Sequence, residues 1–339
     1  MVSKWTQAVK IRMGVCCAEE VCYTPRRRNG DHPSGREFPS VAWPGRGTLT
    51  AVVVADGSAA GEGARLFGPH TVTWQLHADP VMWLAGVCAL HLQALHPRAV
   101  AGVTQNSDFR TDPWGRLRRT ADFVGVVTYG TLRQAGAAAA RVRRIHHTLC
   151  AVDPDTGRRF RLDEPDLLLW VHCATVGCFL TVGRRAGIPL SRTRADRYVE
   201  EQRRAAELVG LDPEEVPGSV AELAAYFARV RPVLRRTPDA EEVHRFLRRP
   251  PLPWWLAGVR LSYLPVGELA YSLLPTWALR LYGHPALPGA AATAALRAVR
   301  TAALLVPGDV RWRLPGSPLG EALRDLGPSG RPSWGDLPV

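Results

Sequence analysis

The stretch at residues 165–182, PDLLLWVHCATVGCFLTV, decides the fold of this protein. Its proline follows Asp163 and Glu164, an order typical of a helix start, and the residues from Leu167 to Val182 are mostly apolar. A second apolar stretch runs from Val81 to Leu95. Each stretch is shorter than the roughly 20 residues of a membrane span, and each contains histidine. Both are therefore predicted to be core helices of a globular protein.

Helix starts recur along the rest of the chain, whereas strand-like alternation is confined to a short pair at residues 50–54 and 158–162. Two patterns are typical of a helix N-terminus. In one, Asp, Ser or Thr directly precedes a proline, and in the other such a residue is followed three positions later by glutamate. We predict an all-α protein with a single helical domain at 64–312. An irregular N-terminal extension at 1–63 precedes this domain, and a flexible tail rich in Pro and Gly at 313–339 follows it. The marked starts are Asp112–Pro113, Asp212–Pro213, Ser219 with Glu222, and Thr237–Pro238.

The composition is that of a globular protein, with 46% apolar and 22% charged residues among 339. The net charge of +12 is carried almost wholly by arginine, since lysine occurs only at Lys4 and Lys10. This pattern indicates the codon bias of a GC-rich genome, and the arginines are interspersed with acids. No helix-turn-helix, zinc-finger or aromatic RNA-binding pattern accompanies the charge, so no nucleic-acid partner is expected.

Seven cysteines are present, but no Cys-x-x-Cys pair that would suggest a structural zinc site. An odd number of thiols, several within apolar runs, suits a reducing compartment. The first thirty residues lack the continuous apolar core of a secretory signal. A cytoplasmic location is therefore expected.

Two histidines are the main candidates for chemistry. His146, or its neighbour His147, lies near the end of a helix predicted over 132–150, and His172 lies on the helix that begins near Pro165. A turn at Asp153–Gly157 separates these helices. If they pack as an antiparallel hairpin, the imidazoles of His146 and His172 differ in height by only ~6 Å and can face one cavity.

The simplest interpretation of His172 is a core histidine bonded to a backbone carbonyl. Its neighbours favour a site instead. Arg116 and Thr120 are four residues apart and share one helix face, while Tyr129 and His96 add polar groups to otherwise apolar segments. Such a polar set suggests a buried ligand with both charged and apolar parts. A b-type haem fits, because its face is apolar, its propionates pair with arginine, and imidazole is a common axial ligand.

The chain resembles the MpaB-type oxygenase family, which includes the latex-clearing proteins that share the rubber-oxygenase catalytic domain. The resemblance covers about residues 64–285, and its segments follow the family's order. They are 92–97 (LQALHP), 108–120 (DFRTDPWGRLRRT), 142–146 (VRRIH), 163–172 (DEPDLLLWVH) and 274–283 (LPTWALRLYG).

The resemblance implies a haem-dependent oxygenase that acts on an apolar substrate, such as an isoprenoid or another alkene, with dioxygen bound opposite an axial histidine. His146 corresponds to that ligand of the haem iron, and His172 to a second histidine that supports haem binding. Arg116 and Thr120 correspond to cofactor-binding and catalytic residues on the oxygen side.

The sequence departs from the family's pattern at three positions. Arg119 stands where some rubber-cleaving relatives carry lysine, and Cys173 follows His172 where a small or hydroxyl residue is expected. The pair His146–His147 leaves the ligand ambiguous, because adjacent helical side chains point about 100° apart. His146 is favoured.

Several alternatives stay open at this point. Glu241-Glu242-Val243-His244 has the Glu-x-x-His spacing of di-iron carboxylate bundles, but the second copy is missing, and an exposed charged helix face explains it more simply. A thiolate from Cys150, Cys173 or Cys178 is a further haem ligand to consider. The non-enzymatic alternative is a helical haem-binding or scaffold protein. Residues 253–256 and 259–264 allow two interpretations. They either contact a membrane surface or pack the C-terminal helices onto the core, and core packing is the simpler of the two.

Overall fold

The computed structural model describes residues 63–337 except 108–111, 250–256 and 313–316. The N-terminal extension expected at 1–63 therefore lies almost wholly outside the described residues, as do the aromatic residues at 253–255. The helices and strands are α1 (Val72–His77), α2 (Met82–Gln93), α3 (Pro97–Asn106), α4 (Pro113–Tyr129), α5 (Leu132–Thr148), β1 (Cys150–Val152), β2 (Arg159–Arg161), α6 (Pro165–Arg185), α7 (Arg192–Leu208), η1 (Pro213–Glu215), α8 (Val220–Val230), η2 (Arg231–Val233), α9 (Pro238–Arg248), α10 (Ala257–Ser272), α11 (Thr276–Tyr282), α12 (Gly289–Leu304), α13 (Gly308–Trp312), α14 (Pro318–Leu326), η4 (Gly327–Gly330) and η5 (Trp334–Asp336).

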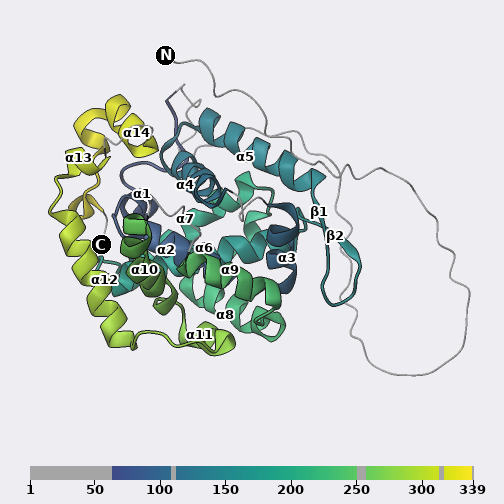
Figure 1. The fold of residues 1–339 in the computed structure, drawn as a ribbon. Helices are drawn as coiled ribbons and strands as arrows, with labels where there is room; N and C mark the ends of the chain where they lie inside the picture. The colour runs from purple at the N-terminus through teal and green to yellow at the C-terminus, as the bar shows by residue number, and fades with distance from the viewer. Residues whose placement is uncertain (1–62, 108–111, 250–256, 313–316, 338–339) are drawn as a thin grey trace, which may run out of the picture. The chain divides into compact units, whose positions relative to one another are not determined.

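The prediction of an all-α protein is confirmed, and the two apolar stretches form its centre (Figure 1). Helix α6 packs along α2, and both contribute to one large hydrophobic core. The Trp170 indole N–H donates to the Gln93 carbonyl at 3.0 Å, and the thiols of Cys88 and Cys178 contact each other at 3.6 Å. These contacts join two segments that are far apart in the sequence.

Helix α6 is longer than the sequence estimate. It spans 21 residues and, by length and composition alone, could cross a membrane. More than half of its most apolar window is buried inside the fold, however. The core packing of α6 against α2 accounts for this apolar character.

Most of the predicted helix starts are confirmed. Asp112 and Thr237 accept backbone N–H bonds at the starts of α4 and α9, and Ser219 does so for α8. Glu222 completes this last cap by accepting from Gly218 N rather than from Ser219 N. Asp212 is an exception to the expected α-helix, since it caps only the three-residue 3₁₀ helix η1.

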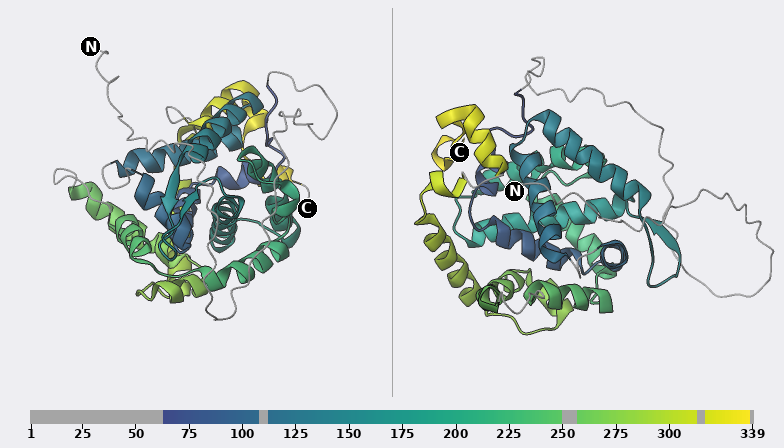
Figure 2. Two further views of the ribbon diagram at one scale, coloured as in Figure 1. Left: turned by 90° about the vertical axis from the view of Figure 1, so that its right-hand side faces the viewer. Right: turned by 45° about the horizontal axis from the view of Figure 1, so that its top comes forward.

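The expected strand at 158–162 exists, and among the described residues it pairs with a segment that the sequence did not indicate. Strand β2 pairs antiparallel with β1, which immediately precedes it, with Ala151 opposite Phe160. Residues 50–54 lie outside the described residues. The turn at Asp153–Gly157 closes this hairpin, with Gly157 at φ 67°, and the hairpin projects from the helices (Figure 2). Helix α5 therefore ends at Thr148, before the hairpin begins.

The prediction of a flexible tail after residue 313 was wrong for its central part. Helix α14 packs against α4, and its Leu319 and Ala322 are buried beside Trp74 and Tyr129. The Trp74 indole N–H also donates to the Gly330 carbonyl at 3.1 Å. Apolar residues spaced along a short amphipathic helix explain the packing, which the Pro and Gly content of this segment obscured.

Several histidines are buried in an uncharged form. His77 lies between Thr128 Oγ1 at 2.9 Å and the Tyr198 hydroxyl at 3.1 Å. Because Thr128 donates its own proton to the Val124 carbonyl, the His77 Nδ1–H donates to Thr128 and its Nε2 accepts from Tyr198. Burial lowers the pKa of His77 to about 3, and the pKa of His96 to about 4.

We expect the free energy of unfolding to fall as the pH drops below about 6.5. In that range the histidines of the unfolded chain bind protons, whereas buried histidines of the folded protein such as His77 stay neutral. The stability is therefore present above pH 6.5 and is lost on acidification. Each such histidine contributes a slope of at most about 1.4 kcal/mol per pH unit. Urea denaturation at pH 7.0, 6.0 and 5.0 measures the slope. His77→Gln should reduce it, whereas the same change at the exposed His70 should not, and an unchanged slope in His77→Gln would contradict the assignment.

Candidate functional site

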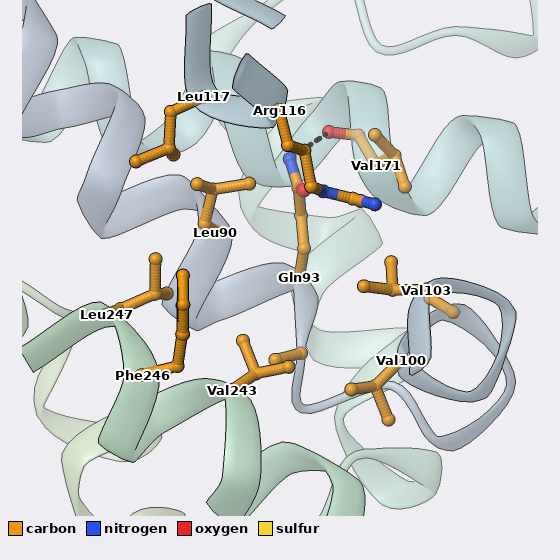
Figure 3. A pocket seen from close by; sticks show the side chains of 12 residues that line it. Leu90, Gln93, Val100, Val103, Arg116, Leu117, Val171, Val243, Phe246 and Leu247 are labelled. Carbon is orange, nitrogen blue, oxygen red and sulfur yellow. Dashed lines mark hydrogen bonds between the residues drawn. The ribbon is translucent and has the colours of Figure 1, made fainter. Parts of the chain in front are cut away.

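A pocket of about 570 Å³, including its part open to solvent, lies between α2, α3, α4, α6 and α9 (Figure 3). Apolar side chains form nearly all of its wall, and only Gln93 and Arg116 are polar. The residues that line it are Leu90, Gln93, Ala94, Ala99, Val100, Val103, Arg116, Leu117, Val171, Val243, Phe246 and Leu247.

Arg116 is the one predicted site residue that lines this pocket. It lies in the first turn of α4, and its guanidinium donates to the Ser107 hydroxyl at the end of α3. Burial and the nearby charge of Arg119 lower the pKa of Arg116 below its ordinary value. In the part of the chain that the structure describes, no carboxylate pairs with Arg116. A partly buried cation without a counter-ion favours a ligand that brings acceptor oxygens.

Thr120 lies one turn further along α4 and is exposed. Its hydroxyl donates to the Arg116 carbonyl at 3.1 Å, a bond within its own helix. Thr120 does not line the pocket. The predicted shared face with Arg116 is present, but the threonine lies outside the cavity.

The two adjacent histidines of α5 differ in their surroundings. The His147 ring is exposed, contacts Asp163 Oδ2 at 3.0 Å and lies beside the Arg161 guanidinium. The His146 ring is partly buried and, within the described residues, makes no hydrogen bond. Among the described residues, both ring nitrogens of His146 therefore lack a partner, whereas Nδ1 of His147 has one.

Helices α4 and α5 form an antiparallel hairpin, with Phe123, Val127, Ala135 and Ala139 packed in one cluster. Arg116 lies about 13 residues before the end of α4 and His146 about 14 residues after the start of α5, so each is about 20 Å from the loop. The electrostatics agree with this placement. Burial lowers the pKa of His146, Asp163 opposes the shift, and the charge of Arg116 adds to it.

His172 lies on α6, next to Val171 of the pocket wall. Burial lowers the pKa of its imidazole to about 4, so the ring is neutral near pH 7. Among the described residues no hydrogen bond to His172 is found, so its interpretation as a core histidine bonded to a backbone carbonyl stays untested.

The expected packing of α5 against α6 is not the main contact of either helix. Helix α5 packs on α4 and α7, while α6 packs on α2 and α7. The β-hairpin between them explains the difference, because it replaces the short loop that adjacent antiparallel helices need. Neither His146 nor His172 lines the pocket that contains Arg116.

A second polar cluster lies in the core and was missed by sequence reasoning. The rings of His91 and His244 are both almost fully buried, with centroids 5.2 Å apart. His244 stacks on His284 at 4.6 Å, and His284 contacts Glu241 at 2.7 Å. The interpretation of 241–244 as an exposed charged face was thus wrong for His244, which points into the core. Among the described residues, no group of three or more His, Cys, Asp or Glu is placed to hold a metal ion, so the di-iron alternative gains no support.

The pocket itself could not be identified from the sequence. Gln93 lies within the segment 92–97 that carried the resemblance, and this was the one available indication of its role. The apolar wall residues of α2, α3 and α9 look like ordinary core residues, because helical periodicity does not distinguish a cavity wall from a packed core.

We expect Val171→Trp to fill the pocket and lower the binding of an apolar dye such as Nile red about tenfold, measured by fluorescence titration. The Val171 side chain is 40% exposed, so the larger ring enters the cavity without displacing the core. Val152→Trp is the matched control, since Val152 is 43% exposed on β1, outside the pocket. Equal dye binding by the two variants would show that the dye does not occupy this pocket.

Residues 74–305 match the protein family described as ER-bound oxygenase mpaB/B'/Rubber oxygenase, catalytic domain. The matched range contains every residue that lines the pocket, together with Thr120, His146 and His172. No curated protein and no solved structure matches the chain.

Proposed function

The chain belongs to the ER-bound oxygenase mpaB/B'/rubber oxygenase catalytic-domain family, and we propose that it uses a b-type haem and dioxygen to oxidise an apolar substrate. The observation that carries the proposal is Arg116, a guanidinium without a carboxylate partner in the described residues, in an apolar pocket. His146 lies opposite it on the next helix of the hairpin.

The side chains near this place suit a haem. His146 and His172 are imidazoles without hydrogen bonds in the described part of the chain, and burial lowers the pKa of both. A ring nitrogen must be unprotonated to bind iron, so these neutral rings are competent ligands. We assign His146 as the axial ligand and His172 as a supporting residue. Cys173 suits a thiolate ligand less well, because burial raises the pKa of its thiol to about 12.

A haem held there would supply the iron chemistry that dioxygen requires. The protein's own part is positional and electrostatic. Arg116 points N–H groups into the pocket, where they can stabilise negative charge that develops on oxygen. Thr120 supports the backbone of the same helix turn through its bond to the Arg116 carbonyl.

The pocket wall suggests the class of substrate. Leucine, valine and phenylalanine side chains from α2, α3 and α9 exclude water and offer no hydrogen bond. Such a wall binds hydrocarbon by burial of apolar surface. An isoprenoid or another alkene is the substrate that this wall and the family description favour together.

We expect His146→Ala to lose most of the Soret absorbance of protein purified after haemin supplementation, because it removes the proposed iron ligand. His147→Ala is the matched control and should keep the absorbance, since His147 is exposed and bound to Asp163. The opposite result would move the ligand to His147. Wild-type protein that is folded but colourless would instead support the scaffold alternative.

We expect Arg116→Ala to lower oxygen uptake with squalene, an isoprenoid alkene, about a hundredfold, the effect of losing one donor that stabilises developing charge. An oxygen electrode measures the rate. Arg118→Ala removes an exposed arginine of the same helix, which pairs with Asp122, and should leave the rate unchanged. Equal rates in wild type and Arg116→Ala would exclude this role for Arg116.

A further inference from the structure

The amide of Gln93 has a fixed orientation. Thr175 donates its hydroxyl proton to the Val171 carbonyl at 2.8 Å, so its oxygen can only accept a further bond. Gln93 Nε2 donates to that oxygen at 3.0 Å and to the Val171 carbonyl at 3.4 Å. Both partners are acceptors, so the NH₂ group of Gln93 must face α6. A flipped amide would place Gln93 Oε1 against two other oxygens.

In the described part of the chain no group donates to the side-chain oxygen Oε1 of Gln93, which is therefore left for the pocket that this residue lines. Gln93 and Arg116 line the same pocket, and Figure 3 shows both among the apolar side chains of its wall, such as Leu90, Val243 and Phe246. The two polar groups are complementary in kind. Gln93 Oε1 can only accept a hydrogen bond, whereas the guanidinium of Arg116 can only donate.

We propose that this polar end selects a substrate that carries a hydroxyl group on an apolar chain. The hydroxyl donates its proton to Gln93 Oε1, and its oxygen accepts from Arg116, so both groups are satisfied at once. The proposal rests on the proposed function and deepens it, because it names the substrate class of the same pocket.

Other end groups match this pair less well. A pure hydrocarbon offers no partner to Gln93 Oε1 or to the N–H groups of Arg116 that Ser107 does not bind. An ether satisfies Arg116 alone, since it has no proton to give. A carboxylate pairs with Arg116 but brings its negative charge close to Gln93 Oε1. A site that bonds a hydroxyl therefore binds the analogue without it less tightly, by about the value of one hydrogen bond.

Thr175 is a positioning residue in this arrangement. It does not itself line the pocket, but its oxygen holds the NH₂ group of Gln93 and so determines which way the acceptor points. The Trp170 indole N–H donates to the backbone carbonyl of Gln93 at 3.0 Å and so fixes the main chain at the same residue.

Isothermal titration calorimetry on the full chain tests the proposal with three probes of one carbon skeleton: geraniol, geranyl methyl ether and geranate. We expect geraniol to bind about tenfold more tightly than the ether, the effect of one buried hydrogen bond. Gln93→Leu should reduce that ratio to about one. Thr175→Val should reduce it about threefold, because the amide is then free to turn.

Gln105→Leu is the matched control. The Gln105 amide bonds the backbone of Val152 on β1 and does not line the pocket, so this variant should keep the wild-type ratio. Thermal melts of all variants identify any that fail to fold, and Thr175→Val keeps the test decisive if Gln93→Leu is among them.

Equal affinity for geraniol and its ether in the wild type would overturn the proposal, as would a preference that survives in Gln93→Leu. Tightest binding of geranate would show that Arg116 alone anchors the ligand. Failure of all three probes to bind would remove the pocket from substrate recognition. None of these results depends on the Soret absorbance, so failure of the haem assignment is distinguishable from failure of this inference.

Discussion

The packing of α6 along α2 is the constraint on which the rest of the structure depends. At its centre the Trp170 indole donates to the backbone carbonyl of Gln93, and the side-chain amide of Gln93 donates to Thr175 and Val171. These bonds fix the relative height of two core helices far apart in sequence. The same contacts place Gln93 and Val171 in the wall of the pocket. Core packing and site geometry are thus set by one group of interactions, because the pocket lies directly beside the contact between the helices.

Burial divides the polar side chains of this protein into two kinds. The imidazoles of His77, His96, His172 and His244 have a pKa of about 4 or lower, since a charged ring would lose its hydration inside the fold. Arg116 cannot respond in this way, because guanidinium stays protonated even where burial lowers its pKa. The molecule therefore presents neutral rings able to bind a metal and a cation that requires an acceptor. The two kinds occur together on the hairpin of α4 and α5, which carries Arg116 and the partly buried His146.

The features predicted correctly from sequence were local ones. The apolar runs became α2 and α6, and Asp112 and Thr237 cap helices as expected, because capping and helical periodicity involve residues only a few positions apart. The errors concerned partners. Strand β2 pairs with β1, which the sequence had not indicated, α14 packs on α4, and His244 points into the core. Each of these outcomes depends on which surface a segment meets, and composition does not reveal that surface.

The sequence by itself determined the all-α class, the core helices and, through its resemblance, the membership of an oxygenase family that the match over 74–305 shows. It also identified Arg116, which the structure places in the pocket, while the roles of Thr120, His146 and His172 stay predictions. Only the tertiary structure decided that His147 faces solvent while His146 is partly buried, and that Gln93, bound to Thr175 through its amide, lines the pocket. The physical reason is that a pocket is a space between helices, set by the packing of α2, α3, α4, α6 and α9 together, whereas each helix follows mainly from its own residues.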